Sequence, residues 1–217
     1  MTISDTTVAI IRAGNIGSKI AANLAAGGQD FLLAGRDQEA ARKIAADLDG
    51  HAEAVSVDEA VDRAGVLVIA VWLDAFKQLI AQYGPRLADK VIVDPSNPIG
   101  PDGHGGIRKV IGEQESSGQI LAGLLPAGAW LVKAFGTLSA PTLSAAGRRE
   151  PERGVLFYAA DDAAAGDLAA DLIRVAGFDP VRVGGLDQSI RIEMFGDLHE
   201  VGALGRVVTK TEALKAI

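Results

Sequence analysis

The stretch that decides the fold is Val8-Ala9-Ile10-Ile11-Arg12-Ala13-Gly14-Asn15-Ile16-Gly17, near the start of the chain. Its first four residues are all apolar, which is typical of a parallel strand that is buried on both faces. The following residues, 15–27, have apolar side chains four positions apart and end at a pair of glycines. This spacing predicts an amphipathic helix that stops at glycine. A buried strand, a glycine turn and a helix are therefore expected in that order.

The same alternation of short apolar runs and helix-length amphipathic stretches continues along the chain. Further strands are predicted at residues 31–34, 52–55, 66–71, 91–94, 130–135, 155–158 and 180–183. Helices are predicted at residues 39–48, up to 63, up to about 83, at 116–125 and at 163–175, and from about 187 to the end. Strands that alternate with helices form parallel sheets with right-handed crossovers. The predicted fold class is therefore α/β, a doubly wound and mostly parallel sheet with a small C-terminal α/β extension.

Two segments rich in turn-forming residues interrupt this alternation. Between Asn97 and Gly106 there are more prolines and glycines than a helix tolerates, so an irregular loop is predicted there. The segment 144–153 is polar and turn-rich. We therefore predict a nucleotide-binding domain over residues 1–143 and a small C-terminal extension, packed on it, over residues 144–217.

The turn between the first strand and the first helix is typical of a site that binds the pyrophosphate of a dinucleotide. In the pattern G-x-G-x-x-G the second glycine lets the backbone approach the phosphates, and the third lets the helix pack on the strand. Gly14 and Gly17 occupy these positions, and the N–H groups of Asn15 and Ile16 would face the phosphates. The first glycine is replaced by Arg12. Its side chain could point aside, add a positive charge at the phosphates, or impair dinucleotide binding.

The end of the second strand indicates which dinucleotide is bound. Proteins that prefer NAD usually have an acidic residue there, which binds the 2′-hydroxyl of the adenosine ribose. Here the sequence is Ala34-Gly35-Arg36-Asp37, and Arg36 would instead bind a 2′-phosphate through charge-assisted hydrogen bonds. We expect Asp37 to cap the helix that follows. The sequence therefore favours NADP(H).

Composition and charge exclude several classes of protein. The chain has 217 residues, 48% of them hydrophobic, and a formal net charge of −7, which argues against a nucleic-acid partner. There is no cysteine, which excludes disulfides and cysteine nucleophiles. The N-terminal residues do not resemble a signal peptide, and the apolar run at Val8–Ile11 is far shorter than the ~20 residues that span a bilayer. We therefore expect a soluble cytoplasmic protein without a membrane partner.

The ordered set of motifs resembles one known family, the NADPH-dependent coenzyme F420 reductases. These proteins are related to the N-terminal domain of pyrroline-5-carboxylate reductase, and they transfer hydride between NADP(H) and a deazaflavin. The resemblance extends from Val8 to about Glu193. Its markers are A-G-N-I-G at 13–17, G-R-D at 35–37, A-V-W-L-D-A at 70–75, D-P-S-N-P at 94–98, V-K-A-F-G-T-L at 132–138, A-D-D at 160–162 and G-F-D-P-V at 177–181.

The resemblance implies a set of cofactor-binding residues at the carboxyl ends of the strands. The residues that would bind NADP(H) are Arg12, Ala13, Gly14, Asn15, Ile16, Gly35, Arg36, Ala70, Val71, Ala75, Asn97 and Ala134. Within this set, Val71 and Ala75 would line the nicotinamide half, Asn97 would lie near the ribose and nicotinamide, and Ala134 would approach the nicotinamide ring. Coenzyme F420 or a flavin would be the co-substrate.

Two departures from the family pattern concern the hydride acceptor. The family commonly has Pro-Trp after the fourth strand, whereas here Trp72 directly follows Val71. It also commonly has asparagine where this chain has Gly136, which removes a donor near the acceptor. The alternatives are therefore an NADPH-dependent reductase of another acceptor, such as a flavin, a ferric chelate, an imine or a carbonyl, or a non-catalytic NADP-binding protein.

No catalytic residue and no metal site are predicted. Hydride transfer depends on proximity and stacking more than on an acid-base pair. Of the histidines, His51 is expected at the surface, His104 in the glycine-rich loop on the ligand side of the sheet, and His199 at a surface or interface. Lys133 could neutralise an acidic acceptor or have a structural role. Arg191 and Glu193, two positions apart, would not share a helix face, and a structural ion pair or a packing role is expected for either.

The predicted C-terminal helix carries an apolar series. Its members are Met194, Phe195, Leu198, Val201 and Leu204. This series could complete the core or form a dimer face that covers the acceptor site. Closed two-fold dimers are the default among soluble oligomers, so we expect a homodimer that acts on a small-molecule acceptor.

Overall fold

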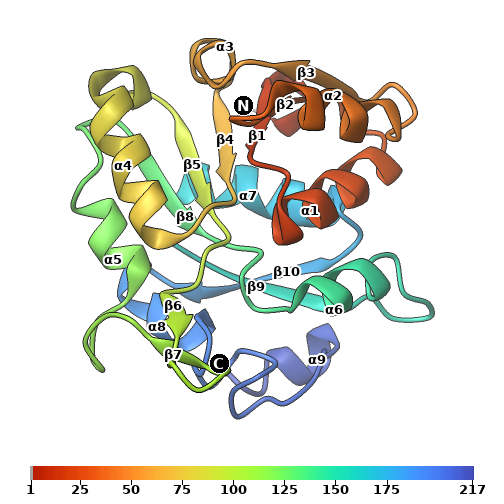
Figure 1. Ribbon diagram of the computed structural model, residues 1–217. Coiled ribbons are helices and arrows are strands. Elements are labelled where there is room, and N and C mark those ends of the chain that lie inside the picture. Colours follow the sequence, from red (N-terminus) through yellow and green to blue (C-terminus); the bar gives the residue numbers. More distant parts are fainter. Residues whose placement is uncertain (1) are drawn as a thin grey trace.

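The computed structural model describes residues 2–217, which form an eight-stranded sheet with helices on both faces (Figure 1). The strands of this sheet are β1 (Val8–Ile11), β2 (Phe31–Ala34), β3 (Ala52–Val55), β4 (Val66–Ile69), β5 (Val91–Asp94), β8 (Trp130–Lys133), β9 (Val155–Ala160) and β10 (Asp179–Gly184). Their order is β10-β9-β8-β5-β4-β1-β2-β3. All neighbours are parallel except β8 and β9. The predicted doubly wound, mostly parallel sheet is confirmed.

Each face of the sheet packs on its own layer of helices. One layer contains α1 (Asn15–Ala26), α2 (Gln38–Ala46), α6 (Ala140–Ala145) and α7 (Ala163–Val175). The other contains α3 (Val57–Arg63), α4 (Leu73–Tyr83) and α5 (Ser117–Ala122). Because successive strand residues point to opposite faces, Val8 and Ile10 enter the first core and Ala9 and Ile11 the second. This explains why the central strands β1, β2 and β4 are apolar throughout.

Side-chain caps fix where several of these helices begin. The carboxylate of Asp37 accepts a hydrogen bond from the N–H of Ala40 at 3.0 Å, so the predicted cap of α2 is confirmed. Ser56 and Glu59 form a capping box at α3. By contrast, α1 begins at Gly14 without a side-chain cap, which leaves its first N–H groups free for a ligand.

The connections after β1 and β4 leave the sheet toward opposite faces, because α1 and α4 lie in different layers. Between adjacent strands whose connections diverge, the carboxyl ends of a parallel sheet leave a crevice. Here β1 and β4 are neighbours, paired from Val8 with Val66 to Ile11 with Ile69. The topology thus places a binding site beyond Ile11 and Ile69.

The C-terminal part of the chain extends the sheet and then covers it. Strands β9 and β10 continue the same sheet, and the segment after β10 packs on them through a third apolar cluster that includes Phe157, Ile192 and Leu198. Figure 1 shows this segment, in blue, at the end of the molecule opposite β3. The prediction of one helix from about residue 187 is wrong. The segment has only the short helix η3 (Leu186–Gln188), which leads directly into α8 (Ser189–Ile192), and the helix α9 (Lys210–Ala213), which follows after a series of turns.

The segment predicted as an irregular loop contains a small hairpin. Strands β6 (Ile99–Pro101) and β7 (Ile107–Lys109) pair in an antiparallel arrangement. Between them the Asp102 carboxylate accepts hydrogen bonds from the N–H groups of His104 and Gly106, which closes the turn. The short helices η1 (Ile3–Asp5) and η2 (Gly84–Leu87) complete the elements. Within the part of the chain described, no helix is both long and apolar enough to cross a membrane.

Candidate functional site

A cleft follows the carboxyl edge of the sheet, across the ends of β2, β1, β4 and β5. It consists of two cavities that share Arg12, Gly14 and Val71. The first, which we call the adenosine-side cavity, is also lined by Ala13, Gly35, Arg36, Asp37, Ala75 and Tyr83. The second, the acceptor-side cavity, has a volume of about 350 Å³ and is also lined by Asn15, Ile16, Ala70, Trp72, Asn97 and His199. The structure thus brings most of the residues expected to bind cofactor into one continuous cleft.

Two expected residues lie elsewhere than the family resemblance implies. Ala134, expected beside the nicotinamide, is 1% exposed and packs in the first core, so it lines neither cavity. Ala75, expected at the nicotinamide half, lines the adenosine-side cavity together with Arg36.

The turn at the centre of the cleft has the backbone of a dinucleotide fingerprint. Arg12 has φ of 72°, the left-handed conformation that glycine adopts without strain. A Cβ at Gly17 would overlap the carbonyl group of Arg12, so the close approach of α1 to this turn requires glycine. The main chain of Arg12 is held by its N–H, which donates to the carbonyl oxygen of Ala34 at 2.6 Å. The turn therefore keeps the fingerprint's geometry although its first glycine is absent.

At the adenosine end of the cleft, Arg36 is exposed and has no hydrogen bond or ion pair with any residue in the described range. Its neighbour Asp37 is the acidic residue nearest to the tip of β2, and its carboxylate is engaged in capping α2. An anion bound here would therefore meet a free guanidinium.

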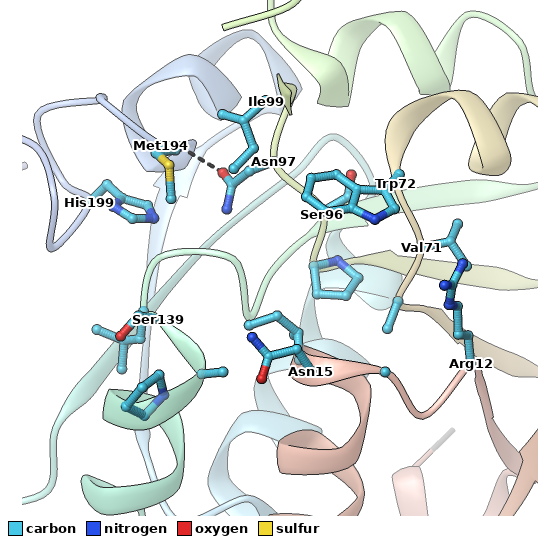
Figure 2. Close-up of a pocket in the computed structure, with 17 residues that line it drawn as sticks. Arg12, Asn15, Val71, Trp72, Ser96, Asn97, Ile99, Ser139, Met194 and His199 are labelled. Atoms are coloured by element: carbon cyan, nitrogen blue, oxygen red, sulfur yellow. Dashed lines mark hydrogen bonds between the residues drawn. The ribbon is translucent and has the colours of Figure 1, made fainter. Parts of the chain in front are cut away.

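At the acceptor end, Asn97 links two loops by hydrogen bonds. Its amide nitrogen donates to the carbonyl oxygen of Gly136 at 3.0 Å, and its oxygen accepts from the N–H of Met194 at 2.7 Å. Figure 2 shows the bond to Met194 and places Trp72 across the cavity from His199. The backbone at Gly136 itself packs closely, because a Cβ there would lie 3.1 Å from the carbonyl oxygen of Pro95. Asn97 thus lines the cavity while its polar atoms hold the wall in place.

His199 belongs to this wall, and the expectation that it lies at a surface or interface is wrong. It is 1% exposed and lines the acceptor-side cavity. Burial lowers the pKa of His199 from 6.5, and the Glu200 carboxylate and the Gly136 carbonyl offset this only in part. The Nδ1 atom accepts a hydrogen bond from the N–H of Val201, so the neutral ring carries its proton on Nε2. Nε2 has no hydrogen-bond partner among residues 2–217.

Local sequence spacing does not predict this wall. Met194 and His199 lie in a segment of turns, which has neither the helical nor the alternating spacing that predicts burial. The signal that existed is the apolar series around them, of which Leu198 enters the core while Phe195 and Val201 stay exposed.

Lys133 forms a buried ionic network behind the cleft. Its ammonium lies 2.7 Å from the Asp94 carboxylate and 2.9 Å from the hydroxyl of Ser117, and it also contacts the carbonyl of Ser96. Glu193 lies 3.8 Å from the ammonium and accepts hydrogen bonds from Ser117 and Gly118. Neither Lys133 nor Glu193 lines the cleft. Of the two roles considered for Lys133, the contacts favour the structural one.

Other candidate residues lie away from the cleft. His104 is exposed in the β6–β7 turn, and His51 is half-buried with Nδ1 2.7 Å from a carboxylate oxygen of Asp30. Arg191 pairs with Asp197 at 2.8 Å. In the described part of the chain no three His, Asp or Glu side chains group as metal ligands would.

Comparison with known proteins places this cleft in a class. Residues 7–98 match the model of a family described as NADP oxidoreductase, coenzyme F420-dependent. This match confirms the family resemblance expected from the sequence over the segment that contains the fingerprint turn and Arg36. The description of this family is that of NADP-dependent oxidoreductases, and the match covers residues 7–98 of the 217. No curated protein sequence matches the chain.

Solved structures share the fold over most of the chain. A hypothetical protein from Sinorhizobium meliloti is 29% identical, with a TM-score of 0.82, and the match covers 97% of this chain and 96% of that one. A proposed F420-dependent NADP reductase from Arthrobacter sp. FB24 is 22% identical, with a TM-score of 0.71 and coverage of 84% and 86%. A pyrroline carboxylate reductase from Plasmodium falciparum, solved with NADP bound, is 13% identical, with a TM-score of 0.56 and coverage of 83% and 58%. The last two likenesses establish the fold alone.

Proposed function

We propose that the chain is an NADPH-dependent oxidoreductase that transfers a hydride between NADP(H) and a deazaflavin of the coenzyme F420 type. The observation that carries this proposal is the single cleft that joins a free Arg36, the uncapped start of α1 and a cavity at the far end. A family match over residues 7–98 supports it.

Different residues of the chain bind different parts of the dinucleotide. Arg36 binds the 2′-phosphate, and the N–H groups at the start of α1 bind the pyrophosphate. Gly14 and Gly17 allow the close approach that this contact requires. Ala70 and Val71 lie at the end of β4 and line the cavity where the nicotinamide would lie. The bound cofactor supplies the hydride, so the protein needs to position two rings rather than to provide an acid-base pair.

The lining of the acceptor-side cavity favours an acceptor that is uncharged where it reacts. Arg12, at the end nearest the pyrophosphate site, is the one formally charged residue of the described chain that lines this cavity, and His199 is neutral. A carboxylate placed near Met194 would lose hydration without gaining a cation, which is costly. Trp72, 58% exposed at the rim, offers a face on which a flat ring can stack. A deazaflavin or flavin ring fits these surroundings better than an imine that carries a carboxylate.

The test combines binding and turnover by the purified chain. Calorimetry should show micromolar binding of NADPH and much weaker binding of NADH. NADPH consumption should be fastest with coenzyme F420, slower with a flavin or a ferric chelate, and absent with a cyclic imine carboxylate. Absence of NADPH binding, or turnover with the imine carboxylate alone, would overturn the proposal. NADPH binding without turnover of any acceptor would identify a non-catalytic binding protein instead.

A further inference from the structure

Arg12 has a strained backbone conformation, and its side chain makes no hydrogen bond or ion pair with residues 2–217 that would offset the strain. The described residues include six non-glycine residues at positive φ: Arg12, Asp49, Asp89, Phe135, Arg148 and Phe195. The left-handed conformation is strained for a residue with a Cβ but not for glycine. Such strain tends to persist at functional sites, where a ligand or a mechanism requires it.

Arg148 is the other arginine in this conformation, and its side chain is hydrogen-bonded within the protein. Its φ is 58°, and its guanidinium donates to the carbonyl oxygens of Ala176, Val175 and Asn23 at 3.3, 2.6 and 2.9 Å. Arg12 differs, because its side chain is exposed and makes no hydrogen bond or ion pair with any residue from 2 to 217. The guanidinium of Arg148 is therefore bound by the protein, whereas that of Arg12 is not.

The position of the Arg12 side chain indicates which group of a ligand it would bind. Arg12 lines both cavities, and a Cβ placed at Gly14 would be 3.8 Å from its Nε. The side chain therefore lies beside the fingerprint turn, at the junction of the adenosine and acceptor sides. Figure 2 shows it on the side of the cavity opposite His199, next to Val71. A dinucleotide that spans the cleft must pass this junction with its pyrophosphate, which is the anionic link between its two halves.

We propose that Arg12 is a pyrophosphate-binding residue, which replaces the fingerprint's first glycine with a cation. This inference rests on the proposed function, because it assumes that a dinucleotide occupies the cleft. The guanidinium donates charge-assisted hydrogen bonds to the phosphate oxygens, which the N–H groups of α1 also bind. The strained backbone is retained because it aims the side chain over the turn. Arg12 and Arg36 therefore bind different phosphates of one ligand.

The decisive experiment compares the wild type with Arg12→Gly, Arg12→Ala and Arg36→Ala. Dissociation constants are measured by calorimetry for NADPH, for ADP, which has a pyrophosphate but no 2′-phosphate, and for adenosine 2′-monophosphate, which has the reverse. Arg12→Gly and Arg12→Ala should both weaken NADPH and ADP by about 10- to 100-fold, the effect of a lost charged hydrogen bond. They should leave adenosine 2′-monophosphate unchanged, whereas Arg36→Ala should weaken this ligand and spare ADP.

Thermal unfolding separates the lost charge from the relieved strain. Arg12→Gly should unfold at the same temperature as the wild type or higher, since glycine accepts φ of 72° freely, and Arg12→Ala should unfold at a lower temperature than Arg12→Gly. Wild-type affinity of Arg12→Gly for NADPH would overturn the inference, as would weakened binding in Arg12→Ala alone. Failure of the wild type to bind NADPH would instead overturn the proposed function.

Discussion

Single side chains in the cleft determine which ligand it can hold. Arg36 is free at the end of β2 because the one acidic residue beside it, Asp37, is bound to the first turn of α2. The sequence predicted both roles, since a residue that follows a strand and precedes a helix has few alternatives. Lys133 and His199 were not predictable in the same way, because their environments are made by segments distant in sequence.

Arg36 should distinguish NADPH from NADH. Arg36→Ala is expected to weaken NADPH binding by about 1.5–3 kcal/mol, the range for a hydrogen bond to a charged group, and to leave NADH nearly unchanged. Titration calorimetry with both cofactors measures this. Arg42→Ala is the matched control, because Arg42 is also exposed nearby but binds Gln38 at 3.3 Å on α2. An equal loss for the two cofactors would contradict the assignment of Arg36 to the 2′-phosphate.

His199 should make stability depend on pH. Burial lowers the pKa of His199 below 6.5 in the folded state, so the unfolded chain takes up a proton first as the pH falls. The contribution of the neutral imidazole to the free energy of unfolding is therefore complete above about pH 6.5. It is lost as the pH falls through the lowered pKa. Urea unfolding at a series of pH values measures the slope. His199→Gln should reduce this slope, whereas His104→Gln, at an exposed histidine, should keep it; equal slopes in both variants would show that His199 is not responsible.

At the scale of elements, an ionic network fastens the C-terminal segment to the sheet. Lys133 at the end of β8 meets Asp94 at the end of β5, Ser117 at the start of α5, and Glu193 just after α8. Four segments far apart in sequence converge there. The network lies directly behind the wall that carries Met194, so it keeps that side of the cleft in place.

Removal of the ammonium from this network should be strongly destabilising. Lys133→Met leaves the buried carboxylates of Asp94 and Glu193 without a cation, and breaking a buried pair in this way costs about 3–5 kcal/mol. Chemical denaturation gives the free energy of unfolding. Arg86→Ala serves as the control, because Arg86 pairs with Asp58 and Asp62 at the surface and such pairs contribute about 0–1 kcal/mol. Similar losses of unfolding free energy in both variants would show that the buried network stabilises the protein no more than a surface ion pair does.

The elements also show where spacing predicts structure and where it fails. The strand at 91–94 and the helix at 163–175 have the predicted bounds, because their residues pack against continuous layers on one or both sides. The β6–β7 hairpin was missed because none of its strand residues is buried and its pairing depends on a turn closed by Asp102. α6 was also missed: it is short and begins with Ala140-Pro141, a proline position that suits a first turn but resembles a loop in sequence.

For the whole molecule, the sheet brings the ends of β1, β2, β4 and β5 to one edge, and the C-terminal segment closes that edge at one end. The chain's acceptor cavity therefore depends on both its N-terminal and C-terminal parts. The family model matches residues 7–98, which contain the fingerprint turn but not Met194 or His199. The family match therefore covers the adenosine-side cavity and the turn but not the C-terminal wall of the acceptor-side cavity.

The assembly state is a prediction for the whole molecule. We expect a homodimer that covers the exposed apolar residues of the C-terminal segment, of which Phe195 is 49% and Val201 52% exposed. Sedimentation velocity measures the mass, and Phe195→Asp combined with Val201→Asp should shift it from dimer to monomer. Leu124→Asp, at a residue 49% exposed beyond α5, should leave the dimer intact. A monomeric wild type would contradict the expectation.

The sequence by itself determined the sheet and the fingerprint turn and predicts a preference for NADP, because each depends on the spacing and chemistry of neighbouring residues. The tertiary structure decided the left-handed conformation of Arg12, the burial of His199 and the pairing of Lys133 with Asp94 and Glu193. The last two features require segments several tens of residues apart to meet, as Lys133 meets Asp94 across 39 positions, and local spacing does not encode such contacts. The turn and strand ends of the adenosine-side cavity can therefore be predicted from neighbouring residues. The acceptor-side cavity also needs contacts between segments that are distant in sequence.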